Sequence, residues 1–347
     1  MRIGPVGESL LERLAVRLRL GPRPLVETHG TILLAQALMV ATRAGVFEAL
    51  AAGPLTAAET AARCAGDERA MGKLLGVLAT TGYLRSTRGR YTLTRDARRW
   101  LLADSPFSLR DNVLFRFVEW EWIAGLDRFL LSGRPLDIHA AMTAEQWGAY
   151  QRGMRSLAAT LAPEVAWRTP VPRGARALLD VGGAHGLYSA ALCRRHPRLD
   201  AVVLDLPAAL EQAAGMLQRE GLAGRIVHRA GDALGDDLGA ETFDLVLVSN
   251  LLHHFDTRQG RDLVRRAARA LRPGGVLVIQ ELFAPATARA GGQLGALADL
   301  YFAMTSESGT LSVDEMAAWQ REAGLRPRRF LRFVSFPGAG QQSAVKP

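Results

Sequence analysis

Residues 177–186 read Ala-Leu-Leu-Asp-Val-Gly-Gly-Ala-His-Gly, and this stretch decides the fold. The apolar run 177–181 has the character of a short buried strand, and residues 182–186 form a tight turn of small residues. Residues 188–195 continue with a helical pattern. A strand that turns directly into a helix leaves backbone N–H groups bare at the helix start, and residues without bulky side chains let a ligand lie against them. The stretch therefore predicts a site for a nucleotide-like cofactor.

The spacing of the small residues narrows the choice of cofactor. A dinucleotide fingerprint needs glycines at 182, 184 and 187, but these positions hold Gly182, Ala184 and Leu187. The small residues fall instead at 182, 184 and 186, preceded by Asp180. This pattern resembles the first motif of class I S-adenosylmethionine (SAM)-dependent methyltransferases. A glycine turn after any buried strand would look similar, so the motif alone leaves a purely structural turn open.

The bulk properties describe an ordinary globular protein. The chain has 347 residues, of which 48% are hydrophobic and 22% charged, so it can hold two domains with cores of their own. The net charge of +9 could indicate nucleic acid, but lysine occurs only at positions 73 and 346 and the many arginines are scattered. We therefore expect no nucleic-acid partner.

The two cysteines and the apolar segments near the N-terminus bear on the cell compartment, on metal binding and on membrane insertion. Cys64 and Cys193 are far apart and have no metal-ligand spacing, which fits a reducing compartment. The N-terminus lacks the continuous apolar core of a signal peptide, and polar residues interrupt the long apolar stretch 31–52. We expect a cytoplasmic protein without a metal site or membrane span.

The N-terminal part of the chain predicts a helical extension and a winged helix. Residues 8–20 and 28–43 have helical periodicity, and the second helix carries little charge, which favours burial against another subunit. Within 46–102 the pattern is helix, turn, helix and hairpin, with a capping box at Thr56–Glu59. A DNA-reading helix needs more polar and basic residues than residues 67–81 offer. Dimerisation or substrate capping is the favoured role, and a ligand-sensing winged-helix regulator is the alternative.

The middle of the chain connects this region to the cofactor domain. Residues 103–160 are predicted to be helical and are well placed to cover a pocket, and the proline-rich stretch 163–174 is predicted to be a linker. We place the boundary near residue 170. The expected parts are an N-terminal helical extension (1–24), a winged-helix dimerisation domain (25–105), a substrate-capping segment with linker (106–170) and a cofactor domain (171–347).

From residue 176 the pattern alternates strand and helix, which predicts an α/β fold with a doubly wound parallel sheet. A helix is expected to open at Ser312, and residues 325–336 and 342–346 can add an antiparallel pair to the sheet. The expected parallel strands are 177–181, 201–206, 225–229, 243–249 and 276–282, and the expected helices between them are 187–195, 208–220 and 257–271.

Polar residues at the ends of these strands are the candidate cofactor ligands, because ligands of such sheets bind beyond the carboxyl ends of the strands. Asp205 could accept hydrogen bonds from both ribose hydroxyls, and Asp232 could meet the adenine amino group. None of the acids suits a phosphate, so a cationic, phosphate-free cofactor such as SAM fits better; each acid alone could also be a helix cap. The expected cofactor-binding residues are Asp180, Gly182, Gly183, Gly186, Asp205, Leu206, Asp232, Ala233, Ser249 and Asn250.

Two histidines follow the fourth strand, at 253 and 254, beside the expected cofactor site. An imidazole titrates near pH ~6.5 and suits general-base work, which typically contributes about 10²–10⁴-fold to a rate. Adjacent histidines cannot easily share one zinc ion, so a metal site is not expected. A histidine satisfied in a loop is the alternative interpretation.

With these pieces in place, the chain resembles the bacterial relatives of plant caffeic-acid-type and acetylserotonin-type O-methyltransferases. These carry a winged-helix dimerisation domain and a seven-stranded, Rossmann-like SAM-binding domain. The resemblance rests on DVGGAHG (180–186), LDLP (204–207), GDAL (231–234), SNLLHHFD (249–256), LRPGG (271–275) and IQEL (279–282).

The resemblance implies roles for further residues. His253 matches the catalytic histidine of the family's Leu-His-Asp-Trp motif, and Glu281 matches a carboxylate that orients this base. Tyr150 and Met154 match residues lining the SAM methyl and the acceptor, and Phe302 and Met304 are expected to line the acceptor pocket.

Departures from the family pattern affect the catalytic residues. The motif's aspartate and tryptophan are His254 and Phe255 here, and a second flanking glutamate is replaced by Thr310. His254 could share the role of the base. Some relatives of this architecture use SAM without methyl transfer, as decarboxylases, hydroxylases or cyclases, and that alternative stays open.

The resulting hypothesis is a homodimeric SAM-dependent O-methyltransferase of secondary metabolism. Its acceptor is expected to be a small, aromatic or polyketide-like natural product with a phenolic hydroxyl. S-adenosylhomocysteine (SAH) is the expected co-product.

Overall fold

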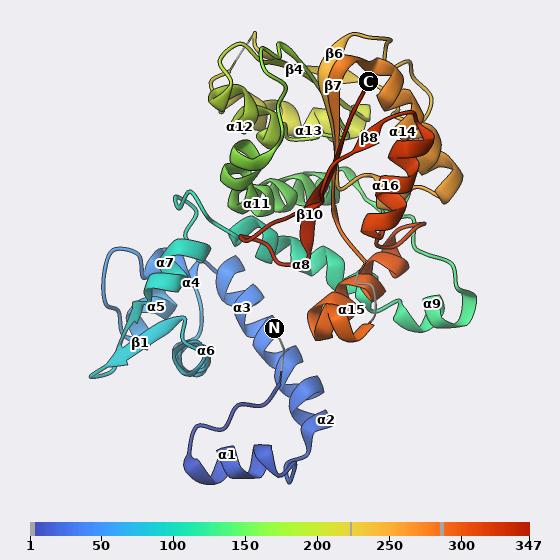
Figure 1. Cartoon of the computed structure of the whole chain (residues 1–347). Helices are drawn as coiled ribbons and strands as arrows, with labels where there is room; N and C mark the ends of the chain where they lie inside the picture. The colour runs from blue at the N-terminus through green and yellow to red at the C-terminus, as the bar shows by residue number, and fades with distance from the viewer. Residues whose placement is uncertain (1–3, 223, 285–287) are drawn as a thin grey trace. The chain divides into compact units, whose positions relative to one another are not determined.

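The structure is a computed structural model that describes residues 4–222, 224–284 and 288–347 (Figure 1). By its internal contacts the chain divides into two compact units, Met1–Phe117 and Val118–Pro347, and each is described by itself. The four-part division expected from the sequence remains a prediction.

The first unit begins with helices that keep their apolar side chains exposed. Ser9 caps α1 in a capping box with Glu12, and no residue of α1 is buried. The helix predicted over 28–43 starts earlier than expected and contains a π-helical turn. An apolar surface of this extent is the kind that a partner subunit covers. The elements are α1 (Leu10–Arg17), α2 (Arg23–Leu25), η1 (Val26–Gly30) and α3 (Thr31–Arg43), and Leu10, Leu11, Ile32 and Leu33 are each at least 50% exposed.

The rest of the first unit has the predicted winged-helix order. The predicted capping box at Thr56–Glu59 forms, and Asp67 caps α6. The hairpin turns at Arg88 and Gly89, which both have positive φ. Its elements are α4 (Val46–Ala49), α5 (Ala57–Arg63), α6 (Glu68–Thr80), β1 (Leu84–Thr87), β2 (Arg90–Leu93) and α7 (Arg95–Leu101), around a core that includes Phe47, Leu50, Leu75 and Leu78.

One helical stretch of the described residues, Arg23–Arg43, is long and apolar enough to cross a membrane. Length and composition are its only support, and apolar helices of proteins that never meet a membrane pass the same test. It is weak evidence for a membrane span.

The region 103–160 is helical, as predicted. Its elements are α8 (Arg110–Ile123), which runs across the boundary between the two units, α9 (Leu126–Ser132), α10 (Ile138–Ala141) and α11 (Ala144–Arg168).

The prediction of a linker from residue 163 was wrong in its first part. α11 continues through Pro163 to Arg168, although proline removes a backbone hydrogen bond inside a helix. Burial of Leu161, Ala162 and Val165 on either side of the proline compensates for the lost bond, since these side chains pack into the core with α12 (Leu187–Arg195).

The second unit is built on a sheet that is seven strands wide. Its order is β5-β4-β3-β6-β7-β10, with the short β8 and β9 both pairing along the free side of β10. The first five strands are parallel, and β10 is antiparallel to β7. The chain therefore reverses its winding direction at β3, which carries the glycine turn. The strands are β3 (Ala177–Val181), β4 (Asp200–Asp205), β5 (Ile226–Ala230), β6 (Phe243–Ser249), β7 (Leu271–Leu282), β8 (Arg326–Pro327), β9 (Leu331–Arg332) and β10 (Ala339–Val345).

The predicted bounds of the parallel strands hold to within one residue, except at β7. The antiparallel pair differs more. β10 begins at Ala339 rather than at residue 342, and only Arg326–Pro327 and Leu331–Arg332 of the predicted stretch 325–336 are strand. The segment Arg272–Gly275 lies outside the predicted strand 276–282 but is part of β7, because Leu271 pairs with Phe243 before a register shift.

Helices cover both faces of the sheet, and each face has its own core (Figure 1). Alternate residues of each strand point to opposite faces, so Leu178 and Leu179 of β3 lie in different cores. α11 and α12 pack on one face, and α14 and α16 on the other. The remaining helices are α13 (Pro207–Gln218), η2 (Leu252–His254), α14 (Thr257–Ala270), α15 (Ala288–Thr305) and α16 (Val313–Glu322).

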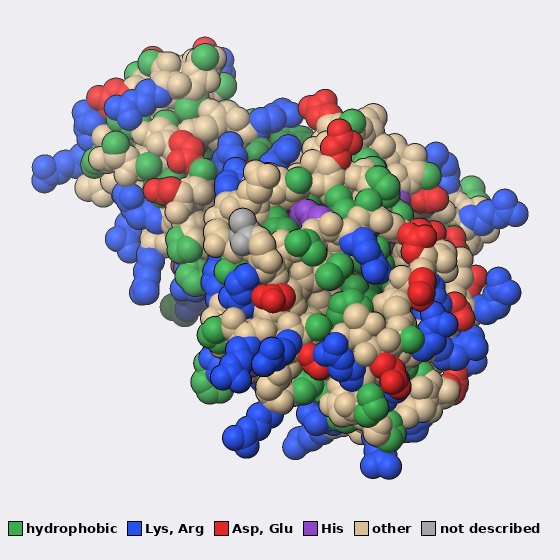
Figure 2. Space-filling model, turned by 90° about the horizontal axis from the view of Figure 1, so that it is seen from above, with side chains coloured by type: hydrophobic (Ala, Val, Ile, Leu, Met, Phe, Trp, Pro, Cys, Tyr) green, Lys and Arg blue, Asp and Glu red, His purple; other side chains and the backbone are tan. Residues whose placement is uncertain are grey.

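The basic residues are distributed over the surface. Figure 2 shows Lys and Arg side chains scattered across the visible face, with acidic side chains between them. This distribution gives no continuous basic stripe on that face.

Candidate functional site

The glycine turn after β3 has a backbone that only small residues can follow. Gly182 and Gly186 have φ of +71° and +66°, in the left-handed region. A Cβ on Gly182 would lie 2.9 Å from the side chain of Leu251, and one on Gly186 would lie 2.9 Å from Leu217. The turn is therefore fixed between neighbouring elements, with its N–H groups at the start of α12.

Asp180 lies directly beneath this turn. Its Oδ2 accepts a 2.6 Å hydrogen bond from the Ser189 hydroxyl, and its Oδ1 is buried without a hydrogen-bond partner. A Cβ on Gly183 would lie 2.4 Å from Asp180 Cγ, so the absence of a side chain there makes room for the carboxylate. Burial raises the pKa of Asp180 to about 7. A buried acceptor without a partner is costly, and a cationic ligand group would relieve it.

Asp205 ends β4 and is held in one orientation. Its two oxygens accept 2.8 Å hydrogen bonds from the N–H groups of Ala184 and Leu206. Burial raises the pKa of this carboxyl to about 6. Each oxygen keeps a second lone pair, so the carboxylate can accept bonds from two neighbouring hydroxyls such as those of a ribose.

The third acid is more exposed. Asp232 accepts a bond from the Leu234 N–H at 2.8 Å and donates its own N–H to Asp236, so it closes a local turn in front of Ala233. Its carboxylate keeps acceptor capacity toward solvent.

A buried polar ladder supports the end of β6. Ser249 Oγ accepts from Gln280 Nε2 at 2.9 Å, and Gln280 Oε1 accepts from Gln341 at 3.0 Å. Gln341 also donates to Thr169 at the end of α11, at 2.9 Å. The next residue, Asn250, has φ of +49° and donates its N–H to the Gln280 carbonyl. The ladder crosses three strands and fixes the backbone at the strand end.

These features fit SAM. The N–H groups of Gly182, Ala184 and Gly186, in the turn where the sequence predicted bare N–H groups, are instead bonded to Leu204 O, Asp205 Oδ2 and Gly183 O. The site therefore offers acceptors. Asp205 has a further lone pair on each oxygen, and the orphaned oxygen of Asp180 offers a negative centre for a cationic ligand. A phosphate would meet the buried carboxylate of Asp180 and the half-buried carboxylate of Asp205 here, which disfavours a dinucleotide.

His253 and Glu281 form a buried pair next to this turn. His253 Nδ1 lies 2.8 Å from Glu281 Oε2, and the two side chains are 5% and 1% exposed. The other oxygen, Oε1, accepts the N–H groups of Leu251 and Leu252, both at 2.9 Å. Glu281 is therefore an acceptor on every side, so Nδ1 carries the proton and Nε2 keeps its lone pair.

The predicted acceptor residues lie on two helices. Phe302, on α15, meets His253 edge-on at 4.6 Å between ring centroids, and Met304 is buried two residues later. Tyr150 and the half-buried Met154 lie one turn apart on α11. Burial raises the pKa of the Tyr150 phenol, with Asp205 contributing, which places the phenol near the carboxylate at the end of β4.

The structure adds a residue that the sequence did not indicate, His139 of α10. Its ring lies 4.5 Å from that of His254, which in turn lies 4.1 Å from that of His253, between ring centroids. His139 stacks on Trp147 at 5.3 Å. A lone histidine far away in the chain carries no sequence signal, so only the fold brings it here.

Thr310 does not contact the histidine pair by any hydrogen bond in the described residues. Its hydroxyl donates to Asp299 of α15. Position 310 thus offers no second carboxylate, and Glu281 is the acid bonded to His253.

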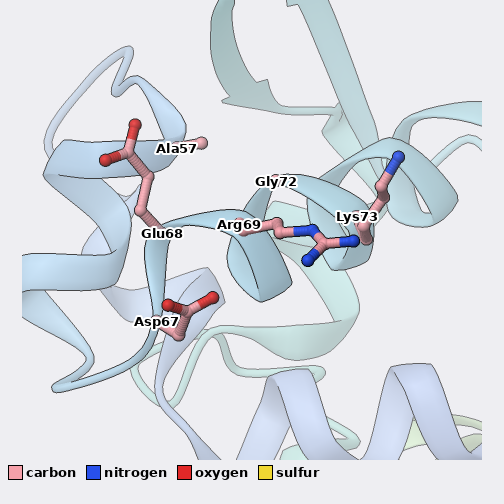
Figure 3. Close-up of a pocket in the computed structure, with 6 residues that line it drawn as sticks. All are labelled: Ala57, Asp67, Glu68, Arg69, Gly72 and Lys73. Carbon is pink, nitrogen blue, oxygen red and sulfur yellow. The ribbon is translucent and has the colours of Figure 1, made fainter.

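A further hollow, of about 560 Å³, lies in the first unit on α6 and is lined by Ala57, Asp67, Glu68, Arg69, Gly72 and Lys73 (Figure 3). Its two acids and two bases are all exposed, and Arg69 and Lys73 extend along the same side of α6. The lining has no net charge and no convergent buried group, so it does not resemble a small-molecule site.

Comparison with known proteins identifies both parts of the chain. Residues 133–326, more than half of the chain, match an O-methyltransferase domain, and residues 26–103 match an O-methyltransferase dimerisation domain.

Individual relatives match over nearly the whole length. The 3-hydroxy-5-methyl-1-naphthoate 3-O-methyltransferase of Streptomyces sahachiroi is 30% identical over 319 residues, covering 90% of this chain and 91% of that protein. The N,N-dimethyltransferase OxyT of Streptomyces rimosus is 30% identical over 329 residues, covering 90% and 93%. Among solved structures, human N-acetylserotonin methyltransferase in complex with SAM has a TM-score of 0.84 at 20% identity, covering 98% of this chain and 99% of that one. At that identity, the likeness shows the fold.

Proposed function

The chain belongs to the SAM-dependent O-methyltransferases that carry a dimerisation domain, and on that premise we propose that it methylates a phenolic hydroxyl of a small natural product with His253 as general base. Its cofactor is SAM, and its dimerisation domain supports a homodimer. Its relatives include a mitomycin biosynthesis 6-O-methyltransferase of Streptomyces lavendulae and a tetracenomycin polyketide synthesis 8-O-methyl transferase of Streptomyces glaucescens.

The observation that carries the proposal is the buried pair of His253 and Glu281. Glu281 holds the Nδ1 proton, so the lone pair of Nε2 is free to take the proton of an acceptor hydroxyl. The negative Glu281 then stabilises the imidazolium that forms. SAM, when bound, supplies an electrophilic methyl group. Holding the acceptor oxygen in line with that group is the larger contribution to the rate.

We propose that the strand-end residues bind the cofactor. Asp205 would accept the ribose hydroxyls, Asp232 with Ala233 would meet the adenine, and the turn from Gly182 to Gly186 would lie against the methionine portion near Asp180. Leu206, Ser249 and Asn250 would complete the walls. The support is the close-packed glycine turn, the fixed carboxylate of Asp205 and the orphaned oxygen of Asp180.

The acceptor would lie between α11 and α15. Tyr150, Met154, Phe302 and Met304 are the proposed lining, which suits a flat aromatic acceptor because aromatic rings favour offset or edge-on contacts. His254 is a second candidate for the base. We also propose the division into residues 1–24, 25–105, 106–170 and 171–347, with the capping segment over the acceptor.

The test has a binding arm and a turnover arm. Calorimetric titration should detect SAM and SAH at one site per subunit and no NAD, and a labelled-methyl screen over phenols should find an acceptor. His253→Ala should then reduce turnover by about 10²–10⁴-fold with SAH affinity nearly intact. Unchanged turnover in that variant would move the base role to His254 or remove it, and the absence of any methylated phenol would refute the acceptor class.

A further inference from the structure

Three histidine rings lie in an unbroken row on the acceptor side of the site. The centroid distances are 4.1 Å from His253 to His254 and 4.5 Å from His254 to His139. The row continues to Trp147, which stacks on His139 at 5.3 Å with an interplanar angle of 23°, and to Tyr150, whose ring meets His139 edge-on at 6.0 Å. The ring of the proposed base is therefore followed by two further imidazoles, His254 and then His139, inside an otherwise aromatic wall.

From this juxtaposition we propose that His254 and His139 recognise an oxygen atom next to the reacting hydroxyl of the acceptor. The preferred acceptors would then be phenols that carry a hydroxyl or carbonyl group in the ortho or peri position. This inference rests on the proposed transfer to a phenol and specifies its substrate class.

The spacing of the His253 and His254 rings lets them bind two neighbouring oxygens of one ligand. Oxygen atoms on neighbouring ring carbons lie roughly one hydrogen-bond length, about 2.7 Å, apart. The rings of His253 and His254 are 4.1 Å apart between centroids, so two such oxygens can be held at once, one by each imidazole. A lone hydroxyl would use His253 and leave its neighbour without a ligand partner.

The rings of His254 and His139 have unused hydrogen-bonding capacity. Across residues 4–222, 224–284 and 288–347, no hydrogen bond joins the ring nitrogens of His254 or His139 to another protein group. Both side chains are only half-buried, so a ligand can reach them. Polar groups in an aromatic pocket that lack a protein partner are the usual means of fixing a ligand's orientation.

The protonation state of His254 and His139 also suits this role. Burial lowers the pKa of His254 well below its usual value, with His253 and His139 adding to the effect, and burial likewise lowers the pKa of His139 against an opposing contribution from Asp137. Both rings are therefore neutral near pH 7, and each offers one N–H donor and one lone pair. Such a pair can donate to a carbonyl or accept from a hydroxyl.

Hydrogen-bonding sites of this kind discriminate more strongly than apolar pockets. A site built to bond a substrate hydroxyl rejects the analogue that lacks it, because its own polar groups lose a partner. For a half-buried neutral pair we expect a preference of about tenfold.

The experiment compares 2,3-dihydroxynaphthalene with 2-naphthol, which differ only in the neighbouring hydroxyl. With the full-length enzyme, SAM and a labelled-methyl assay, kcat/KM should be about tenfold higher for the diol. In His254→Phe and His139→Phe this ratio should fall to about twofold, the statistical value for two equivalent hydroxyls. His196→Phe, at the C-terminal cap of α12, is the matched control and should keep the full preference.

Binding provides a readout that does not depend on turnover. Calorimetric titration of both naphthols into the enzyme saturated with SAH should show the same preference in Kd, lost in the same two variants. If His254→Phe or His139→Phe no longer binds SAH, the histidine at that position is replaced by leucine instead and the titration is repeated.

The outcomes separate the inference from the function on which it rests. Equal methylation of both naphthols, or a preference that survives both substitutions, overturns the inference and leaves phenol transfer standing. If neither naphthol is methylated although SAH binds, phenol transfer fails. The titrations then decide, because tighter binding of the diol that depends on His254 and His139 supports the recognition and equal or absent binding overturns it.

Discussion

Replacing Glu281 with glutamine tests how the base is prepared. The carboxylate accepts hydrogen bonds on both oxygens, from Leu251 and Leu252 on one and from His253 on the other. In Glu281→Gln, only the amide oxygen can accept the two backbone N–H groups, so the amide NH₂ faces His253 Nδ1. Nδ1 must then become an acceptor, and the ring proton moves to Nε2, where the lone pair is needed.

The expected magnitude follows from losing the base while keeping the packing. General-base catalysis is worth about 10²–10⁴-fold, and the equivalent change beneath the histidine of serine proteases costs about 10⁴-fold through the wrong tautomer. We expect kcat to fall within that range. Since the backbone bonds survive, Tm should stay within about 3 °C of the wild type, whereas Glu281→Ala would strand two buried N–H groups at about 1–3 kcal/mol each.

The assay combines steady-state methyl transfer with SAH titration and thermal unfolding. SAH affinity should change less than about threefold, because an isosteric change leaves the loop at residues 251–252 in place. Glu145→Gln, an exposed position in the first turn of α11, is the control for a lost carboxylate. A Glu281→Gln enzyme that keeps more than a tenth of the wild-type kcat, with SAH binding and Tm intact, would refute the tautomer argument.

Three further changes probe the cofactor turn, the core and the dimer. Burial raises the pKa of Asp180 from 3.8 to about 7, so the wild-type folded state loses stability as pH rises between these values. The free energy of unfolding of Asp180→Asn, relative to that of the wild type, should therefore be roughly 3 kcal/mol higher at pH 8 than at pH 5. A difference in Tm between the two proteins that does not change with pH would contradict this. Gly260→Ala would place a Cβ 2.8 Å from the Trp319 side chain and should lower the free energy of unfolding by about 1–3 kcal/mol in denaturant unfolding. The control Gly215→Ala, at a position with open space around it, should be neutral or stabilising by up to about 1 kcal/mol. Similar values for both variants would argue against the tight contact at Gly260. Leu33→Asp, at a position 56% exposed on α3, should shift the homodimer toward monomer in light scattering, and an unchanged mass would exclude this face from the interface.

The sequence was sufficient to predict the fold where local signals agreed with tertiary ones. The glycine turn at 182–186, the capping box at Thr56–Glu59 and the apolar strand run 177–181 each specify one local structure, and each forms as expected. Pro163 misled because its local penalty is outweighed by burial of α11, which no short-range pattern reveals.

The site was predictable in part, for a topological reason. Parallel strands bring their carboxyl ends to one edge, so residues at the ends of β3, β4 and β6 could be grouped without knowing any distance. His139 lies on the four-residue helix α10, outside the sheet, and nothing in its sequence surroundings links it to His254. The unused hydrogen-bonding capacity of these rings appears only in three dimensions.

The order of strands in the sheet has a consequence for how the chain is made. β10 lies between β7 and the short pair β8 and β9, yet a ribosome produces it after all three. Until residues 339–345 emerge, at about 5–20 residues per second, β7 presents an open edge that can pair with another nascent chain. Gln280 has no Gln341 to bond during that interval, so the support of the cofactor edge is among the last features completed in translation.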